Sequence, residues 1–145
     1  MTATPQSYAN HRRVFPLYHL FALPVLLVHV AVTFVGALRE PTLWTFWTFL
    51  VAIGLVAAVV ANRASTLIVQ NRVIGLEMRL RLATVLPVEL CQRIPELDIK
   101  QLVGLRSAGD AELPGLVERC LRGELPTADA VKRAVTQWRP DYVRA

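Results

Sequence analysis

Two long stretches without a charged residue follow one another in the first half of this chain. They cover residues 16–38 and 41–62 and are rich in Leu, Val, Ala and Phe. A helix needs about 20 apolar residues to cross the hydrocarbon core of a bilayer, and a lone strand would leave its backbone groups unpaired there. The sequence therefore predicts an all-α hairpin of two transmembrane helices over residues 16–61, with spans at about 16–38 and 42–61.

The start of the first stretch also has features of a secretory signal. Arg12 and Arg13 form a positively charged flank, and Gly36-Ala37 resembles a small-residue cleavage site. Signal peptides usually have apolar regions of about 7–15 residues. Since this stretch is longer and a second span follows within a few residues, we expect a retained anchor and not a cleaved signal.

The arginines around the hairpin predict its orientation. The turn between the spans, residues 39–41, carries one Arg and one Glu and so has no net charge. The outer flanks carry an excess of arginine, at Arg12, Arg13, Arg63, Arg72, Arg79 and Arg81. Because positively charged flanks stay on the cytoplasmic side of a membrane, both termini are expected in the cytoplasm, with residues 1–15 as a cytoplasmic N-terminal segment.

Aromatic residues favour the same placement. Amphipathic rings are enriched at the two membrane interfaces. We therefore expect Tyr8, Phe15 and Tyr18 at the inner interface, and Trp44 and Trp47 at the outer one.

The positive charge of the chain, +5 in total, is concentrated beside the predicted membrane. Residues 62–81 hold four Arg and one Glu, whereas residues 82–145 hold nine basic and nine acidic residues. Basic groups near anionic lipid headgroups contribute about 1 kcal/mol each, so headgroup contacts are expected at Arg12, Arg13, Arg63 and Arg72. The balanced tail lacks the electrostatic surplus that DNA binding requires, so no nucleic-acid partner is expected.

The second helix is expected to continue beyond the membrane as a cytoplasmic stalk over residues 62–86, because no proline interrupts it before Pro87. One apolar row has the 4, 3, 4, 3 spacing of a coiled-coil seam: Val69, Val73, Leu76, Leu80 and Ala83. A second row is less regular: Leu67, Asn71, Ile74, Met78 and Leu82. Two rows require two neighbours, namely the C-terminal part of the chain and a second copy or partner subunit. Alternatively, both rows pack inside one small domain.

Residues 87–145 are expected to form a small tail of short helices packed on the stalk. Pro87 starts the first turn, and Asp98 with Gln101 forms a capping-box pattern before the next helix. An amphipathic run from Leu113 to Leu121 precedes Gly123, which is expected to cap it. Thr127 then caps a last helix, with Val131, Ala134, Val135 and Trp138 on one face and Pro140 at its end.

Four stretches carry a resemblance to a known family: "NHRRVFPLYH", "QNRVIGLEMRLRL", "DIKQLVGLRSAGDAELPGLVERCL" and "WRPDY". Together they resemble an uncharacterised family of small bacterial proteins with two transmembrane helices and a short cytoplasmic tail. The resemblance covers nearly the whole chain. It implies a bacterial inner-membrane location and supplies no mechanism.

Neither the histidines nor the cysteines of the chain are spaced as a metal or cofactor site requires. His19 and His29 are ten residues apart, which on one helix separates them by about 80° and about 15 Å. They could bind a cofactor only within an oligomer. The simpler interpretation is that His19 lies near the membrane interface and that His29 is hydrogen-bonded across the hairpin, to Thr45 or Thr48. Cys91 and Cys120 lack metal-motif spacing and lie in the expected cytoplasmic part, where disulfides are rare; we expect buried free thiols.

The sequence contains no motif of a nucleophile, a phosphate-binding loop or a carboxylate pair within a span, so no catalytic residue is predicted. We expect a noncatalytic accessory or scaffold subunit that binds a protein partner, or itself, at the cytoplasmic membrane face. Its expected contacts are Val69, Val73, Leu76, Leu80 and Trp138. The alternatives are a cofactor- or ligand-binding membrane protein that uses His19 and His29 in an oligomer, and a subunit of a membrane enzyme or transporter complex.

Overall fold

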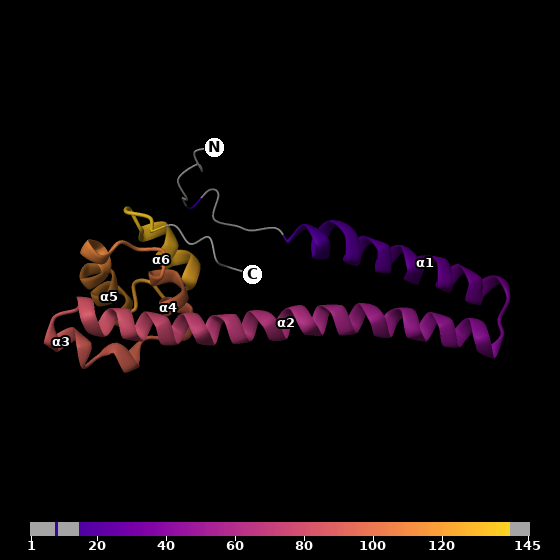
Figure 1. Ribbon diagram of the computed structural model, residues 1–145, viewed down its shortest axis with the longest axis horizontal. Helices are drawn as coiled ribbons and strands as arrows, with labels where there is room; N and C mark the ends of the chain where they lie inside the picture. The colour runs from indigo at the N-terminus through magenta and orange to yellow at the C-terminus, as the bar shows by residue number, and fades with distance from the viewer. Residues whose placement is uncertain (1–7, 9–14, 140–145) are drawn as a thin grey trace. The chain divides into compact units, whose positions relative to one another are not determined.

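The computed structural model describes Tyr8 and residues 15–139, and the described part is all-α (Figure 1). The chain divides into two compact units. We refer to residues 13–67 as the hairpin unit and to residues 1–12 with 68–145 as the tail unit. The helix α2 (Leu43–Val85) begins in the hairpin unit and ends in the tail unit.

The hairpin unit contains the expected pair of helices. The π-helix η1 (Leu17–Ala22) leads into α1 (Leu23–Arg39), and a short turn connects α1 to α2. The wide turn of η1 precedes Pro24, whose ring cannot donate a hydrogen bond to the preceding turn and would clash with it. The continuous helix formed by η1 and α1, Leu17–Arg39, and the helix α2 are each long and apolar enough to cross a membrane. The predicted all-α hairpin is confirmed.

The turn of the hairpin is closed by its own polar groups. The Glu40 amide donates to the Gly36 carbonyl at 3.0 Å, which ends α1. Thr42 then caps α2, since its hydroxyl accepts from the Thr45 amide at 3.2 Å. The Thr45 hydroxyl donates back to the Glu40 carbonyl at 2.7 Å. Two backbone amides and two backbone carbonyls that would otherwise need water are thereby satisfied within the turn.

The two helices of the hairpin unit meet through small and aromatic side chains. Ala37 of α1 and Ala52 of α2 are the fully buried residues among those described in this unit. The rings of Phe34 and Phe49 lie beside them, with centroids 5.3 Å apart. Most of the large apolar side chains on both helices are exposed.

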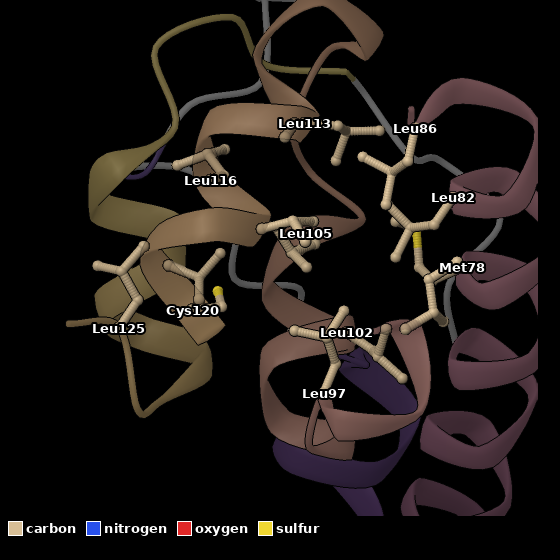
Figure 2. Close-up of a cluster of buried hydrophobic side chains, with 14 of the residues drawn as sticks. Met78, Leu82, Leu86, Leu97, Leu102, Leu105, Leu113, Leu116, Cys120 and Leu125 are labelled. Atoms are coloured by element: carbon tan, nitrogen blue, oxygen red, sulfur yellow. The ribbon is translucent and has the colours of Figure 1, made fainter. Parts of the chain in front are cut away.

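The tail unit is built from short helices on the last turns of α2. They are α3 (Val88–Cys91), η2 (Ile94–Glu96), α4 (Ile99–Leu105), η3 (Asp110–Glu112), α5 (Leu113–Leu121) and α6 (Ala128–Ala134). Figure 2 shows the side chains of Met78 and Leu82 on α2, and of Leu86 directly after it, pointing toward those of Leu102, Leu105 and Leu113. The stalk therefore supplies apolar surface that so short a tail could not provide alone.

Three expected helix caps are confirmed in the tail unit. The Gln101 side chain accepts from the Asp98 amide at 2.9 Å, as a capping box requires. Gly123 has a φ of 78°, and its amide donates to Cys120, which closes α5 in the left-handed conformation that glycine favours. The Thr127 hydroxyl accepts from the Ala130 amide at the start of α6.

Glycine permits a close contact between α4 and α6 in the tail unit. A Cβ atom on Gly104 would lie 2.6 Å from the Cβ of Val131 and 3.0 Å from the carbonyl oxygen of Ala128. Both of those atoms are held by α6, so the close packing of α4 on α6 depends on the missing side chain.

The last helix is shorter than the sequence indicated. The apolar spacing predicted a helix that continues to Pro140, whereas α6 ends at Ala134 and Val135 is extended. Residues 137–139 instead pair with residues 107–109: the Gly109 amide donates to Gln137 at 2.9 Å, and the Arg139 amide donates to Ser107 at 2.8 Å. This backbone pairing, together with hydrogen bonds from the Thr136 and Gln137 amides to the Glu112 carboxylate, replaces the final helical turns.

Tyr8 makes contacts that the aromatic pattern did not indicate. Its hydroxyl donates to the Asp129 carboxylate at 2.7 Å and accepts from Arg133 at 3.0 Å. The Arg133 guanidinium lies 5.3 Å from the centre of its ring. The hydrogen bond from Tyr8 holds the pKa of Asp129 below its usual range, together with the charges of Arg133 and Lys132. Tyr8 thus belongs to the tail unit, docked on α6.

Candidate interaction surface

The part of α2 within the tail unit has one covered face. Ile74, Met78 and Leu82 are four residues apart and lie on one side of the helix, where each is buried in the core. Gly75 lies beside this face, and Ile99 of α4 occupies the space where a Cβ atom would be. The second, less regular row of the sequence is therefore the one that the tail covers.

The opposite face of α2 is open. Val69, Val73, Leu76 and Leu80, which we name the α2 seam, are 60%, 49%, 61% and 73% exposed. At about 100° per residue, Val69, Leu76 and Leu80 lie within about 20° of the point opposite Met78, and Val73 within about 40°. The tail unit covers one of the two predicted rows and leaves the coiled-coil-spaced row without a neighbour in the described part of the chain.

Trp138 is not part of this surface. It is half-buried against the core of the tail unit, and its residue pairs with Ala108 in an isolated bridge. The five predicted partner contacts are therefore not brought together. Four of them form the α2 seam, whereas Trp138 packs against the core of the tail unit, which lies on the covered face of α2.

Charged side chains flank the α2 seam asymmetrically. Arg72 and Arg79 lie along one edge, at about 120° and 100° from Met78 around the helix. Glu77 lies along the other edge, at about 100° from Met78 in the opposite direction. Gln70 and Thr84 lie along the same edge, one heptad before and one heptad after Glu77. Arg72, Glu77 and Arg79 are exposed.

Arg81 has a structural role that the sequence did not indicate. Its guanidinium pairs with Asp110 at 2.6 Å and donates to the Ala108 carbonyl at 2.7 Å. The Arg81 side chain is only 15% exposed. Arg81 therefore binds the loop between α4 and α5 to α2. From the sequence alone, it was grouped with the arginines that flank the predicted membrane spans.

The four arginines predicted to contact lipid headgroups do not share one environment in the structure. Within the hairpin unit, the Arg63 guanidinium lies 5.9 Å from the centre of the Tyr18 ring, a cation–π distance. Arg72 is exposed at the edge of the α2 seam. Arg12 and Arg13 fall outside the described residues.

His19 and His29 lie on exposed faces of the hairpin unit. The Nδ1 atom of His19 is 3.0 Å from the Phe15 carbonyl, so a local backbone contact accounts for the ring. Among the described residues, no three His, Cys, Asp or Glu side chains are grouped as a metal ion would require. The structure does not bring the two histidines together.

Both cysteines are free thiols in the tail unit. Cys120 is buried in α5, and this burial raises its pKa to about 11 against the small opposing effect of Arg119. Cys91 is half-buried, with its sulfur 3.3 Å from the Leu86 carbonyl. A thiol with a raised pKa is a poor nucleophile, so the geometry of Cys120 fits a packing role.

Sequence reasoning missed Glu112, which organises the end of the chain. Its carboxylate accepts from the Thr136 amide at 3.0 Å, the Thr136 hydroxyl at 2.8 Å, and the amides of Gln137 and Gly109 at 3.2 Å. Partial burial raises the pKa of Glu112, but these hydrogen bonds outweigh it and the pKa is lowered overall. The only local signal was an acidic residue directly before α5, which is typical of a helix N-terminus.

Comparison with known proteins identifies the family. The whole chain, residues 1–145, matches a family of unknown function, DUF6526. The chain belongs to this family. No curated protein and no solved structure matches it. The resemblance to an uncharacterised family is thereby confirmed over the full length, and the function must be argued from the structure.

Proposed function

We propose that this protein is a noncatalytic, membrane-anchored accessory or scaffold subunit that binds a protein partner through the α2 seam. The observation that carries the proposal is the pair of faces on α2. One face is already covered by the tail unit, and the other presents four large apolar side chains at coiled-coil spacing. Contiguous exposed apolar surface outside a membrane span marks an interaction site.

Charge and hydropathy support a specific membrane arrangement. The two apolar helices cross the inner membrane of a bacterial cell, and the arginine-rich flanks remain in the cytoplasm. The turn at residues 39–42 then faces outward, and the α2 seam lies on the cytoplasmic side. Arg63 and Arg72 are close enough in sequence to the span to reach anionic headgroups.

The polar groups that the fold gathers support a structural and not a catalytic role. Arg81 fixes a loop, Glu112 holds the C-terminal segment, and Gln101 bonds the Cys120 and Leu125 carbonyls at 3.2 and 3.1 Å. Each of these groups is engaged by the backbone of its own chain. The α2 seam, by contrast, is a large apolar feature of the tail unit that residues 15–139 leave exposed.

The proposal is tested by membrane fractionation and photo-crosslinking of the full chain. A photoreactive amino acid at Leu76 is expected to give specific crosslinked products in membranes, whereas the same residue at exposed Arg122 on the tail unit is not. A tag at Ala145 is expected to be protected from protease added outside spheroplasts. Recovery of the chain in the soluble fraction, an externally accessible Ala145, or equal crosslinking from both positions would overturn the proposal.

A further inference from the structure

The α2 seam has the heptad register of a coiled coil. Val73 and Leu80 occupy heptad positions a, and Val69 and Leu76 occupy positions d. The central pair, Val73 at a and Leu76 at d, is the combination of β-branched and leucine residues that favours two parallel strands. All four side chains are exposed on the same face.

The flanking charges discriminate between the two possible helix directions. In this register Arg72 and Arg79 are at positions g, whereas Gln70, Glu77 and Thr84 are at positions e. In a parallel pair, each g residue faces the e residue five positions later on the other helix. Arg72 of one copy then meets Glu77 of the other, twice by symmetry.

An antiparallel pair of the same seams would bring like charges together. Positions g then face positions g, so Arg72 of one copy lies against Arg79 of the other, twice by symmetry. Like charges at contact distance are destabilising. The seam is thus electrostatically complementary to itself in one direction only.

Both members of the proposed ion pair are exposed on α2. Among the described residues, Arg72 and Glu77 form no ion pair or hydrogen bond through their side chains. Glu77 is the only acidic residue of α2. The packing of the tail unit does not explain why Glu77 lies at one edge of the α2 seam, five residues after Arg72 at the other edge.

We propose that the occupant of the α2 seam is a second copy of this chain, parallel and in register, with Arg72 of each copy paired to Glu77 of the other. The inference rests on the proposed function, because two copies with the same orientation in one bilayer necessarily present parallel α2 helices. Closed twofold pairing is also the commonest assembly of identical subunits. The shared membrane supplies the confinement that two heptads need to associate.

The first test is disulfide trapping of the full chain in membranes. Leu76→Cys places thiols at a d position, where the two copies approach most closely, and mild oxidation is expected to give a covalent dimer. Arg122→Cys is the control at an exposed site of the tail unit, and the unmodified chain reports any background from Cys91 and Cys120. A failure of Leu76→Cys to crosslink above these controls would overturn self-pairing.

The second test exchanges the charges. Arg72→Glu and Glu77→Arg are each expected to reduce trapping through Leu76→Cys by about fivefold, since exposed ion pairs are individually weak and two are lost. The double exchange is expected to restore it. Co-expression of the two single variants, distinguished by tags, is expected to give mainly mixed dimers, because every contact is then between opposite charges.

The mixed-dimer result separates pairing from any effect on folding, since a misfolded variant would not be rescued by a different variant. Trapping through Leu76→Cys that is insensitive to both charge changes would show that Arg72 of one copy does not face Glu77 of the other, and would overturn the parallel, in-register pairing. Crosslinking of Leu76 exclusively to a different protein would overturn self-pairing and leave the proposed function standing. Recovery of the chain as a soluble protein would instead overturn the proposed function, whatever the trapping result.

Discussion

The two parts of α2 treat apolar side chains in opposite ways. From Leu43 to Leu67, nearly all the large apolar residues are exposed and small Ala52 is buried. Within the tail unit, one face of the same helix is buried by protein and the other is open. A segment that exposes apolar residues on most of its surface requires lipid around it, whereas a segment with one open stripe requires one neighbour. A single uninterrupted helix thus presents surfaces suited to two different environments.

The largest expected effect tests the covered face against the open one. Leu82→Ala removes a fully buried side chain and is expected to destabilise the tail unit by about 2–5 kcal/mol, because a cavity remains in the core. Leu80→Ala is the matched control on the α2 seam and is expected to change the stability by less than about 0.5 kcal/mol. Amide hydrogen exchange of α4 and α5 in detergent-solubilised full chain measures both.

Equal loss of protection in the two variants would mean that the α2 seam supports the core of the tail unit as much as the covered face does. That result would remove the distinction between the two faces. Full protection in Leu82→Ala would contradict the core assigned to the tail unit.

A charge on either part of α2 sharpens the comparison. Leu50→Arg is expected to impair membrane integration, since an arginine near the centre of a span costs about 2.5–3.5 kcal/mol on insertion scales. Leu80→Arg introduces the same side chain into the α2 seam and is expected to leave integration unchanged. The measurement is the fraction of chain that resists extraction from membranes with alkaline carbonate. Extraction of both variants to the same extent would place the membrane boundary elsewhere.

Much of the fold could be predicted because its determinants are local in sequence. The apolar stretches, the cap at Thr42, the capping box of Asp98 and the glycine at position 123 each act within one or two helical turns. The spacing of α5 likewise placed Leu113, Leu116, Val117 and Cys120 on its buried face. Local patterns of this kind identify elements and their ends without knowledge of the tertiary structure.

The remaining features depend on partners that are distant in sequence. Periodicity indicated two apolar rows on α2 but not which of them the tail would cover. In the structure the tail covers the row of Ile74, Met78 and Leu82. Gly75 lies beside this row and lets Ile99 approach α2 closely. Val135 and Trp138 fit a helical spacing, but Glu112, more than 20 residues earlier, binds the intervening backbone amides. Tyr8 fits the pattern of an aromatic residue at a membrane interface, but that pattern does not indicate its hydrogen bonds to α6.

Glu112 gives the smallest expected effect and tests whether the tail unit depends on this long-range contact. Glu112→Gln keeps the shape of the side chain but places an amide group where one carboxylate oxygen accepted hydrogen bonds. It is expected to cost about 1–2 kcal/mol at neutral pH. Glu89→Gln is the control, since Glu89 is exposed on α3. Hydrogen exchange of the α5 amides reports the change.

The pH dependence of that stability has a defined sign. The pKa of Glu112 is lower in the folded chain than its ordinary value, so the contribution is fully present above about pH 4.3 and is lost as the pH falls through the folded pKa. The unmodified chain should therefore lose stability below about pH 4, and Glu112→Gln should lose less over the same range. Parallel pH profiles for the two chains would show that protonation of Glu112 does not release the C-terminal segment, and would assign that segment's position to the backbone pairing of residues 107–109 with 137–139.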